Sequence, residues 1–455
     1  MTGIFERAAV RRLVLVFACT ALWAGAAQAT ANSKLTIYRG ATLIDGTGAE
    51  LRPDMAIIVD GERIRAIIPD KNAGTWLRGA TTVDVHGLYA IPGLIDSHVH
   101  LATAPNRRYE EALLRRFVYG GVTAVRDMAG DDRVLADLSR AALLGEIPAP
   151  DIYYAALMAG PPFFKDPRTA AAARGAVPGE VPWMRAVTPS TDLRLAIAEA
   201  HGTGATGIKI YADLPGDLVR NITAEAHRQD MLVWAHAAVF PASPREVIDA
   251  GVDVVSHSCL LAYQASEHMP PAYHNRPPVE EEKFQGGQNP VLDGLFADMK
   301  QRATILDATL YVYEAMWRAP HSQSRPYCSL ALAERIAAAA HNAGIPVSTG
   351  TDDPGDWRDL FPSLDDELSL LVRSASFSPM EAIVAATRIG AMTVGKSKDM
   401  GTIARGKLAN IVFLAKDPLA DIGNVRSVRM TLKRGQLYRR SDYQPITKDE
   451  AKGEF

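Results

Sequence analysis

Cysteine is scarce in this chain. Three cysteines occur among 455 residues, and two of them, Cys259 and Cys328, would remain after loss of the N-terminal segment described below. Two cysteines do not make the disulfide framework that small secreted domains use. We therefore expect buried free thiols, although an oxidising compartment would permit a disulfide between them.

An excess of charge of either sign is also absent. The 52 acidic residues nearly balance the 49 basic ones, and the formal net charge is -3. Such a balance provides no field for nucleic acid or for an anionic membrane. We therefore expect no nucleic-acid partner, and a small molecule or a short peptide as the substrate. A homo-oligomer is compatible with these totals.

The apolar run at the N-terminus, Leu13 to Trp23, is too short to span a bilayer. Its flanks predict a cleaved signal peptide over residues 1–29, because basic residues precede the run and small residues follow it. The mature protein is then expected in the periplasm or secreted, without stable membrane insertion. The flanking residues are Arg7, Arg11 and Arg12 before the run, and Ala27-Gln28-Ala29 after it.

β-rich runs with turn signals lie near both ends of the chain, for example Ala56 to Val59 and Ile411 to Leu414. Between them, apolar strands alternate with Ala-rich helices, which is typical of parallel strands joined by right-handed crossovers. About eight such units suit a closed barrel, whose active face is the carboxyl end of its strands. The predicted α/β architecture is a (β/α)8 TIM-type barrel over residues 91–395, a small β-sandwich composed of residues 30–90 and 396–444, and a loose tail over residues 445–455.

The strongest local signal is the pair His98 and His100, which ends an apolar strand behind Pro92-Gly93. Side chains at i and i+2 of a strand lie on the same face, so both imidazoles can point at one ion. An H-x-H pair alone is weak, but its place at the first barrel strand is where a metal ligand is expected.

Further strand ends offer metal-competent side chains: His236, His257 and Asp352. Lys209 lies inside a strand and faces away from the neighbouring isoleucines, into the barrel. A buried ammonium is costly, so Lys209 is either ion-paired, reaches solvent, or is a neutral amine that captures carbon dioxide as a carbamate. We favour the carbamate, because such residues at successive strand ends indicate a metal site rather than scattered core residues.

The order H-x-H, Lys, His, His, Asp resembles the amidohydrolase superfamily, in its branch of metal-dependent dipeptidases, prolidases and imidazolonepropionase-like proteins. The stretches 120–127, 385–391 and 401–410 are similar to the second strand, the helix after the barrel and the re-entering hairpin of that superfamily. Asn410 departs from it, since Asp is usual there, and the segment 155–164 differs from the better-studied peptidases.

The resemblance implies two divalent metal ions, expected to be Zn2+. His98 and His100 would bind the more buried ion, and His236 and His257 the more exposed one. Lys209 would be N6-carboxylated and bridge the two ions, with carbon dioxide as the source of the carbamate. Asp352 would both ligate and accept a proton.

Two cations sharing one water should lower its pKa from about 15.7 towards 7, which supplies a metal-bridged hydroxide at neutral pH. Asp352 would pass the proton to the leaving amine. Tyr211 shares a strand face with Lys209 and could donate to the oxyanion or anchor a carboxylate. The Pro-rich stretch 264–290 is expected to cover the barrel mouth. Looser candidates for holding a substrate carboxylate are Arg126, Tyr311, Tyr313 and Arg318.

The favoured activity is hydrolysis of an amide, a non-ester carbon–nitrogen bond, in a dipeptide or an N-acyl amino acid. A mononuclear hydrolase of cyclic amides (imidazolonepropionase-like) or a deaminase would keep Lys209 as a plain amine. A phosphotriesterase or lactonase could use the same two-metal site. A non-catalytic exported binding protein would have no need of all six ligands.

Overall fold

The computed structural model describes residues 35–285, 289–318 and 327–453, all within one compact unit that spans Lys34–Phe455. The predicted signal peptide, residues 1–29, lies outside the described residues. Among those that are described, no helix combines the length and the apolarity needed to cross a membrane.

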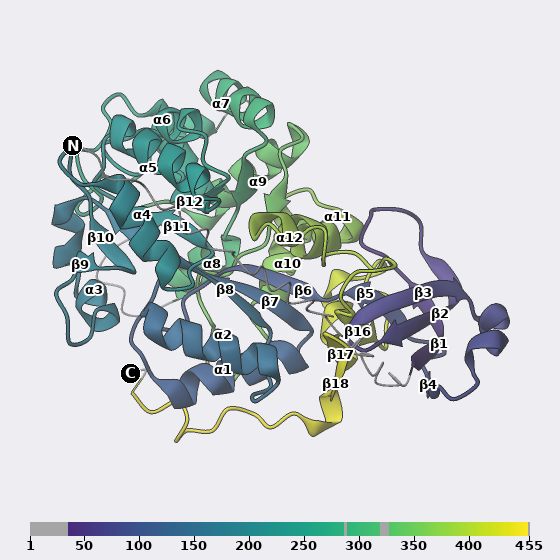
Figure 1. Ribbon diagram of the computed structural model, residues 1–455. Helices are drawn as coiled ribbons and strands as arrows, with labels where there is room; N and C mark the ends of the chain where they lie inside the picture. The colour runs from purple at the N-terminus through teal and green to yellow at the C-terminus, as the bar shows by residue number, and fades with distance from the viewer. Residues whose placement is uncertain (1–34, 286–288, 319–326, 454–455) are drawn as a thin grey trace, which may run out of the picture. The chain divides into compact units, whose positions relative to one another are not determined.

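The centre of the fold is a barrel of parallel strands, which confirms the predicted class (Figure 1). Each strand pairs in parallel with its neighbour along the chain. The barrel closes where Ser97 N donates to Thr349 O at 2.7 Å, which joins the first strand to the segment after the last. In order, the strands are β6 (Leu94–Val99), β7 (Val122–Asp127), β8 (Asp151–Ala159), β11 (Gly207–Ile210), β12 (Leu232–His236), β13 (Val254–Ser256), β14 (Ile305–Asp307) and β15 (Val347–Ser348).

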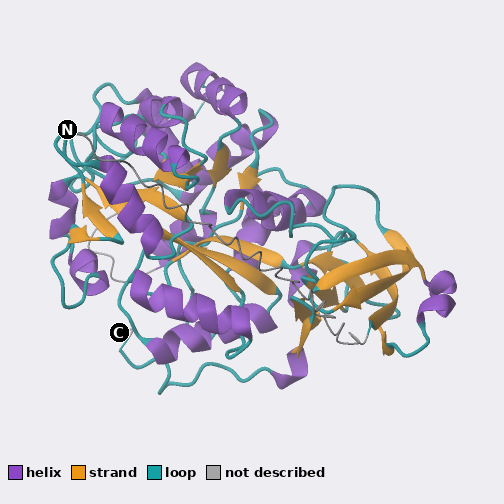
Figure 2. Ribbon diagram, in the orientation of Figure 1, coloured by secondary structure: helices purple, strands orange, loops and turns teal. Residues whose placement is uncertain are grey.

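Helices surround these strands (Figure 2). Their apolar faces join the outward-facing strand residues in the largest buried cluster of the protein. Side-chain caps fix several helix starts; Asp131, Asp192 and Ser329 each accept from a backbone N–H of the first turn. The helices are α1 (Arg107–Tyr119), α2 (Asp132–Leu144), α3 (Pro167–Ala172), α4 (Leu193–Gly202), α5 (Gly216–Arg228), α6 (Pro244–Asp249), α7 (Pro290–Arg302), α8 (Leu310–Arg318), α9 (Leu330–Asn342), α10 (Leu364–Ser374), α11 (Pro379–Val384) and α12 (Gly390–Thr393).

An insertion after β8 adds a wall to the carboxyl end of the barrel. It contains α3 and the hairpin of β9 (Glu180–Val181) and β10 (Met184–Ala186), and β10 pairs in parallel with the second half of β8. Its side chains Phe163, Trp183 and Met184 pack in one cluster with Tyr211 from the end of β11. The insertion therefore builds one side of the barrel mouth.

The two ends of the chain meet in a separate mixed sheet, with the order β18-β17-β16-β5-β1-β2-β3 and β4 paired to β1 (Figure 1). Hydrogen bonds connect these strands into one sheet, and both arms share one core, in which Tyr38 stacks on Phe413 at 5.2 Å between ring centroids. The composite origin matches the sequence prediction. The strands are β1 (Thr36–Leu43), β2 (Arg52–Asp60), β3 (Arg63–Pro69), β4 (Thr81–Asp84), β5 (Tyr89–Pro92), β16 (Ile411–Leu414), β17 (Val428–Lys433) and β18 (Gln436–Arg439).

The segment after Pro445 differs from the expected loose tail. Ile446 and Ala451 are buried against α1 residues Tyr109 and Leu113. Arg115 also forms an ion pair with Glu450 at 3.0 Å. Apolar contacts, this ion pair and a hydrogen bond from Asn106 Nδ2 to the Lys452 carbonyl oxygen at 3.1 Å hold the described part of the charged segment against α1 and its N-cap.

Cys259 and Cys328 form a disulfide, with 6.2 Å between their Cα atoms. This corrects the expectation of free thiols. The two positions are 69 residues apart in sequence, and the packing of α9 against the 3-10 helix Ser258–Ala265 brings this part of the chain together. Closing a loop of this length restricts the unfolded chain and stabilises the fold by about 4 kcal/mol in the chain-entropy model.

Candidate functional site

The side chains predicted as ligands converge at the carboxyl end of the barrel. His98 lies near the end of β6 with His100 just beyond it, His236 ends β12, and His257 follows β13. Asp352 Oδ1 lies 3.1 Å from His100 Nε2 and 3.4 Å from His98 Nε2. The ring of His257 is 4.8 Å from that of His236 and 5.0 Å from that of His98, between centroids.

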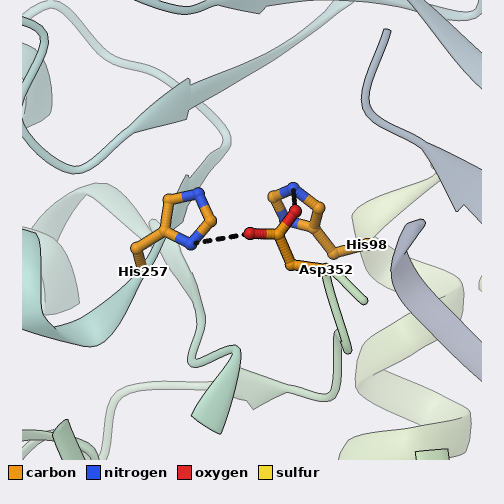
Figure 3. A group of neighbouring side chains, drawn as sticks. All are labelled: His98, His257 and Asp352. Atoms are coloured by element: carbon orange, nitrogen blue, oxygen red, sulfur yellow. Dashed lines mark ion pairs between the residues drawn. The ribbon is translucent and has the colours of Figure 1, made fainter. Parts of the chain in front are cut away.

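Three of these residues could share one ion directly. A nitrogen of His98, a nitrogen of His257 and an oxygen of Asp352 lie within 4.8 Å of one another (Figure 3). His257 and Asp352 both adopt positive φ, 74° and 55°, a conformation that costs energy for residues other than glycine. Such strain at neighbouring positions is typical of functional sites.

Lys209 lies in the same interior, on β11 beside β12. Its side chain is fully buried, and among the described residues its Nζ has no hydrogen-bond partner. Burial lowers the pKa of Lys209 to about 7, against the opposing attraction of Asp352. A large fraction of the amine is therefore neutral and nucleophilic near physiological pH.

The charge states of the other ligands suit a cation. Burial lowers the pKa of His257 to about 3 and that of His236 well below its usual range. Burial opposes ionisation of Asp352, yet His98 and His100 hold its pKa well below the ordinary value. Burial also lowers the pKa of His98, whereas at His100 burial is outweighed by nearby carboxylates, chiefly Asp352 through its hydrogen bond, and the pKa is raised. The site thus combines three imidazoles of lowered pKa with one carboxylate, and His236 Nδ1 has no hydrogen-bond partner among the described residues.

Asp307, at the end of β14, orients the first ligand. Its Oδ2 accepts from His98 Nδ1 at 2.8 Å and from Arg126 Nη2 at 2.9 Å. With the Nδ1 proton held by a carboxylate, His98 Nε2 keeps its lone pair and faces Asp352. Thr309 Oγ1 lies 2.9 Å from His257 Nδ1, the ring nitrogen that also lies 3.8 Å from Asp352 Oδ2 (Figure 3). Sequence reasoning missed Asp307, although its position at a strand end was a signal.

A cavity of about 350 Å³ lies over the cluster and includes His100, His236, His257 and Asp352 in its wall. The rest of the wall is largely apolar and aromatic, with two arginines, Arg168 from α3 and Arg276 from the stretch that was expected to cover the barrel mouth. Other residues of the wall are Leu157, Phe163, Met184, Tyr211, Leu260, Tyr273, Val312, Met316 and Tyr327.

Tyr211, predicted to act beside Lys209, lines this cavity. Its hydroxyl accepts from Arg168 Nη1 at 3.3 Å, and its ring lies 4.1 Å from that of His236. Arg168 is itself held by Asp166, to which its Nη2 donates at 2.8 Å. The insertion after β8 therefore fixes the Tyr211 hydroxyl next to the cluster.

The other predicted substrate contacts do not line the cavity. Arg126 faces inward but is fully buried below the cluster, between Asp307 and the ring of Trp234. Tyr311 is buried beside Glu367, which accepts from its backbone N. Tyr313 is buried and its hydroxyl pairs with that of Tyr327, while Arg318 is exposed and pairs with Glu314. The sequence named these four residues as candidates but provided no measure of their depth, and the arginines that line the cavity are Arg168 and Arg276.

Comparison with known proteins agrees with this fold. The imidazolonepropionase of Anaeromyxobacter dehalogenans strain 2CP-1 is 28% identical over 398 residues, which cover 80% of this chain and 85% of the relative. Among solved structures, a Xaa-Pro dipeptidase with bound methionine in the active site has a TM-score of 0.69 at 21% identity, over 89% of this chain and 100% of the other. The ochratoxinase of A. niger has a TM-score of 0.71 at 21% identity, over 91% of this chain and 98% of the other.

The model of the amidohydrolase family matches residues 89–438. That range includes every strand of the barrel, the six predicted ligands and the returning strands of the terminal sheet. The chain therefore belongs to the amidohydrolase family and is a hydrolase that acts on carbon–nitrogen bonds.

Proposed function

We propose that the protein is a metal-dependent hydrolase that cleaves the amide bond of a dipeptide or an N-acyl amino acid. The observation that carries the proposal is the buried Lys209 amine, which has no hydrogen-bond partner in the part of the chain that the structure describes and is enclosed by a barrel end that also holds four histidines and Asp352. A structural lysine in such a place would have an anionic partner, as Lys433 has in Asp151 at 2.9 Å.

The residues fit a pair of divalent cations. His98 and His100 would hold one ion and His236 and His257 the other, with Asp352 as a further ligand and Lys209 between them after carboxylation. In that carboxylation the neutral amine bonds to the carbon of carbon dioxide and loses one proton, which gives an anionic carbamate with two oxygens. Zn2+ suits imidazole and carboxylate ligands, and when bound it supplies Lewis acidity that activates water and polarises a carbonyl.

The protein's own groups account for the proton movements and for orientation. Asp352 is anionic, so it can accept the proton of the attacking water and return it to the leaving nitrogen. The Tyr211 hydroxyl accepts from Arg168 and can donate its own proton to the oxygen that gains charge. The apolar wall of the cavity limits water around these charges and strengthens their interactions.

A mononuclear hydrolase of cyclic amides is a second candidate, favoured by the similarity to imidazolonepropionase across most of the chain. Lys209 would then stay an amine and the enzyme would carry one ion. A deaminase and a phosphotriesterase or lactonase share the same type of site. A non-catalytic binding role is set aside, because the chain belongs to a family of hydrolases.

Metal removal tests the proposal directly. We expect dialysis against a chelator to lower the hydrolysis of hippurate and of a dipeptide panel by at least about 100-fold, and Zn2+ to restore it, because the site would lose its activated water. Elemental analysis should find close to two ions per active chain. One ion per chain, or turnover of a cyclic amide, an ester or a phosphotriester in preference to every linear amide, would contradict the proposal.

Export of the mature protein is a further part of the proposal. It is supported by the N-terminal sequence and by the Cys259–Cys328 disulfide, since such bonds persist in oxidising compartments. Expressed in a Gram-negative host, the protein recovered from the periplasm should begin at Thr30. A cytoplasmic product that keeps residues 1–29 would contradict the predicted signal peptide.

A further inference from the structure

Arg276 is held in the wall of the cavity by two aromatic rings. Its guanidinium carbon lies 4.3 Å from the ring centroid of Tyr273 and 4.3 Å from that of Tyr327. Its Nη1 donates to the Tyr273 carbonyl oxygen at 2.7 Å. The rings are placed for cation–π contact, and the N–H groups of a guanidinium lie in its own plane, so a further hydrogen-bonding partner approaches Arg276 in that plane.

The charge of Arg276 has no anionic partner within residues 35–285, 289–318 and 327–453. Among the described residues no carboxylate forms an ion pair with Arg276, and its buried Nε has no hydrogen-bond partner. Arg168, the other arginine of the cavity, differs in this respect, because Asp166 already neutralises it through Nε and Nη2.

Arg276 lines the same cavity as the cluster residues His236, His257 and Asp352. A half-buried cation without a counter-charge is unfavourable, and an anion in the cavity would relieve that cost. An in-plane approach to a guanidinium favours a planar anion that accepts two parallel N–H bonds, which is the geometry of a carboxylate.

We propose that Arg276 binds the carboxylate of the substrate and so restricts the enzyme to amides whose amine part is an amino acid with a free carboxylate. This inference rests on the proposed amide hydrolysis. The Tyr273 and Tyr327 rings keep the guanidinium in one orientation, and the disulfide at Cys328 anchors the segment that carries Tyr327. Arg276 is thus a specificity-determining residue that lies outside the predicted ligand set.

Binding is measured with probes that have no carbon–nitrogen bond to cleave at the reacting carbonyl. 3-Benzoylpropionate is the ketone analogue of hippurate, and its primary amide lacks only the negative charge. In calorimetric titrations of the metal-loaded enzyme, we expect the acid to bind at least about 30-fold more tightly than the amide, as charge-assisted hydrogen bonds predict. Equal affinity of the wild-type enzyme for both probes would overturn the inference.

Arg276→Met keeps an apolar chain of similar length between the two rings and removes the charge. This substitution should weaken binding of the acid about 30-fold and change the affinity for the amide by less than about threefold. Arg276→Lys should keep only part of the preference for the acid, because lysine lacks the planar pair of N–H donors. Arg318→Met, which removes an exposed arginine outside the cavity, should change neither affinity. A preference for the acid that survives in Arg276→Met would refute the assignment.

Kinetics separate this inference from the proposed function. For hippurate, Arg276→Met should raise KM by a similar factor with a smaller change in kcat, since the lost contact is remote from the reacting atoms. If the wild-type enzyme hydrolyses no linear amide but still binds the acid through Arg276, the proposed function fails and the carboxylate site stands. If the wild-type enzyme hydrolyses linear amides equally well with and without a carboxylate, the proposed function stands and the role of Arg276 in specificity fails.

Discussion

Lys209→Met should abolish bound metal and lower kcat/KM by at least about 1000-fold, if the loss of the cations removes at least about 4 kcal/mol of transition-state stabilisation. The physical reason is that the carbamate would be the anion shared by both ions, and a thioether cannot replace it. Elemental analysis and kcat/KM on the best substrate of the panel measure the effect. In Lys209→Ala, short carboxylic acids should restore part of the bound metal and part of kcat/KM, because they fit the space that the lysine side chain leaves.

A stability measurement distinguishes this role from a structural one. In the metal-free protein, Lys209→Met should be at least as resistant to thermal unfolding as the wild type, because the buried amine makes no hydrogen bond to the described residues that the substitution would break. A large loss of stability in Lys209→Met, or an active enzyme that retains two ions, would contradict the proposed bridge.

Asp352→Asn should lower kcat by about 100- to 10000-fold, the range that a general acid–base group contributes. The amide keeps the shape of the carboxylate but cannot accept the proton of water. KM should change little, because the contacts that hold the substrate lie elsewhere in the cavity. Single-turnover kinetics on enzyme with its metal content measured isolate the chemical step.

The neighbouring residue provides a matched control for this substitution. Asp353 accepts from Gly355 N at 2.7 Å and does not line the cavity. Asp353→Asn should therefore leave kcat within about threefold. Comparable losses in both variants would indicate a distorted loop rather than the loss of a proton acceptor at Asp352.

The ligand set was predictable because, in a regular strand, the spacing of residues in the sequence determines the direction in which their side chains point. Alternation along β6 places His98 and His100 on one face, and parallel strands bring His236 and His257 to the same end of the barrel. The inward direction of Lys209 follows from the same rule. The family resemblance added the roles that spacing alone could not assign.

Strand alternation did not predict how deeply a side chain is buried, nor where residues of irregular segments point. Arg126 faces inward as alternation requires, yet it lies beneath Asp307 and cannot reach the cavity. Arg276 comes from a Pro-rich stretch without periodicity, so no rule connects its position in sequence with a direction in space. The Cys259–Cys328 pair likewise depends on how a distant segment docks.

The closure of the barrel has a consequence for how the active site is assembled. Thr351 Oγ1 donates to Asp96 at 2.9 Å across 255 residues of sequence, and Asp352 N donates to the His98 carbonyl oxygen at 2.8 Å. Ligands from the first and the last strand thus stand on opposite sides of one seam. Metal binding would hold the first and last strands together. A chain interrupted before residue 352 should therefore have neither a closed barrel nor a complete metal site, and metal uptake should report completion of the fold.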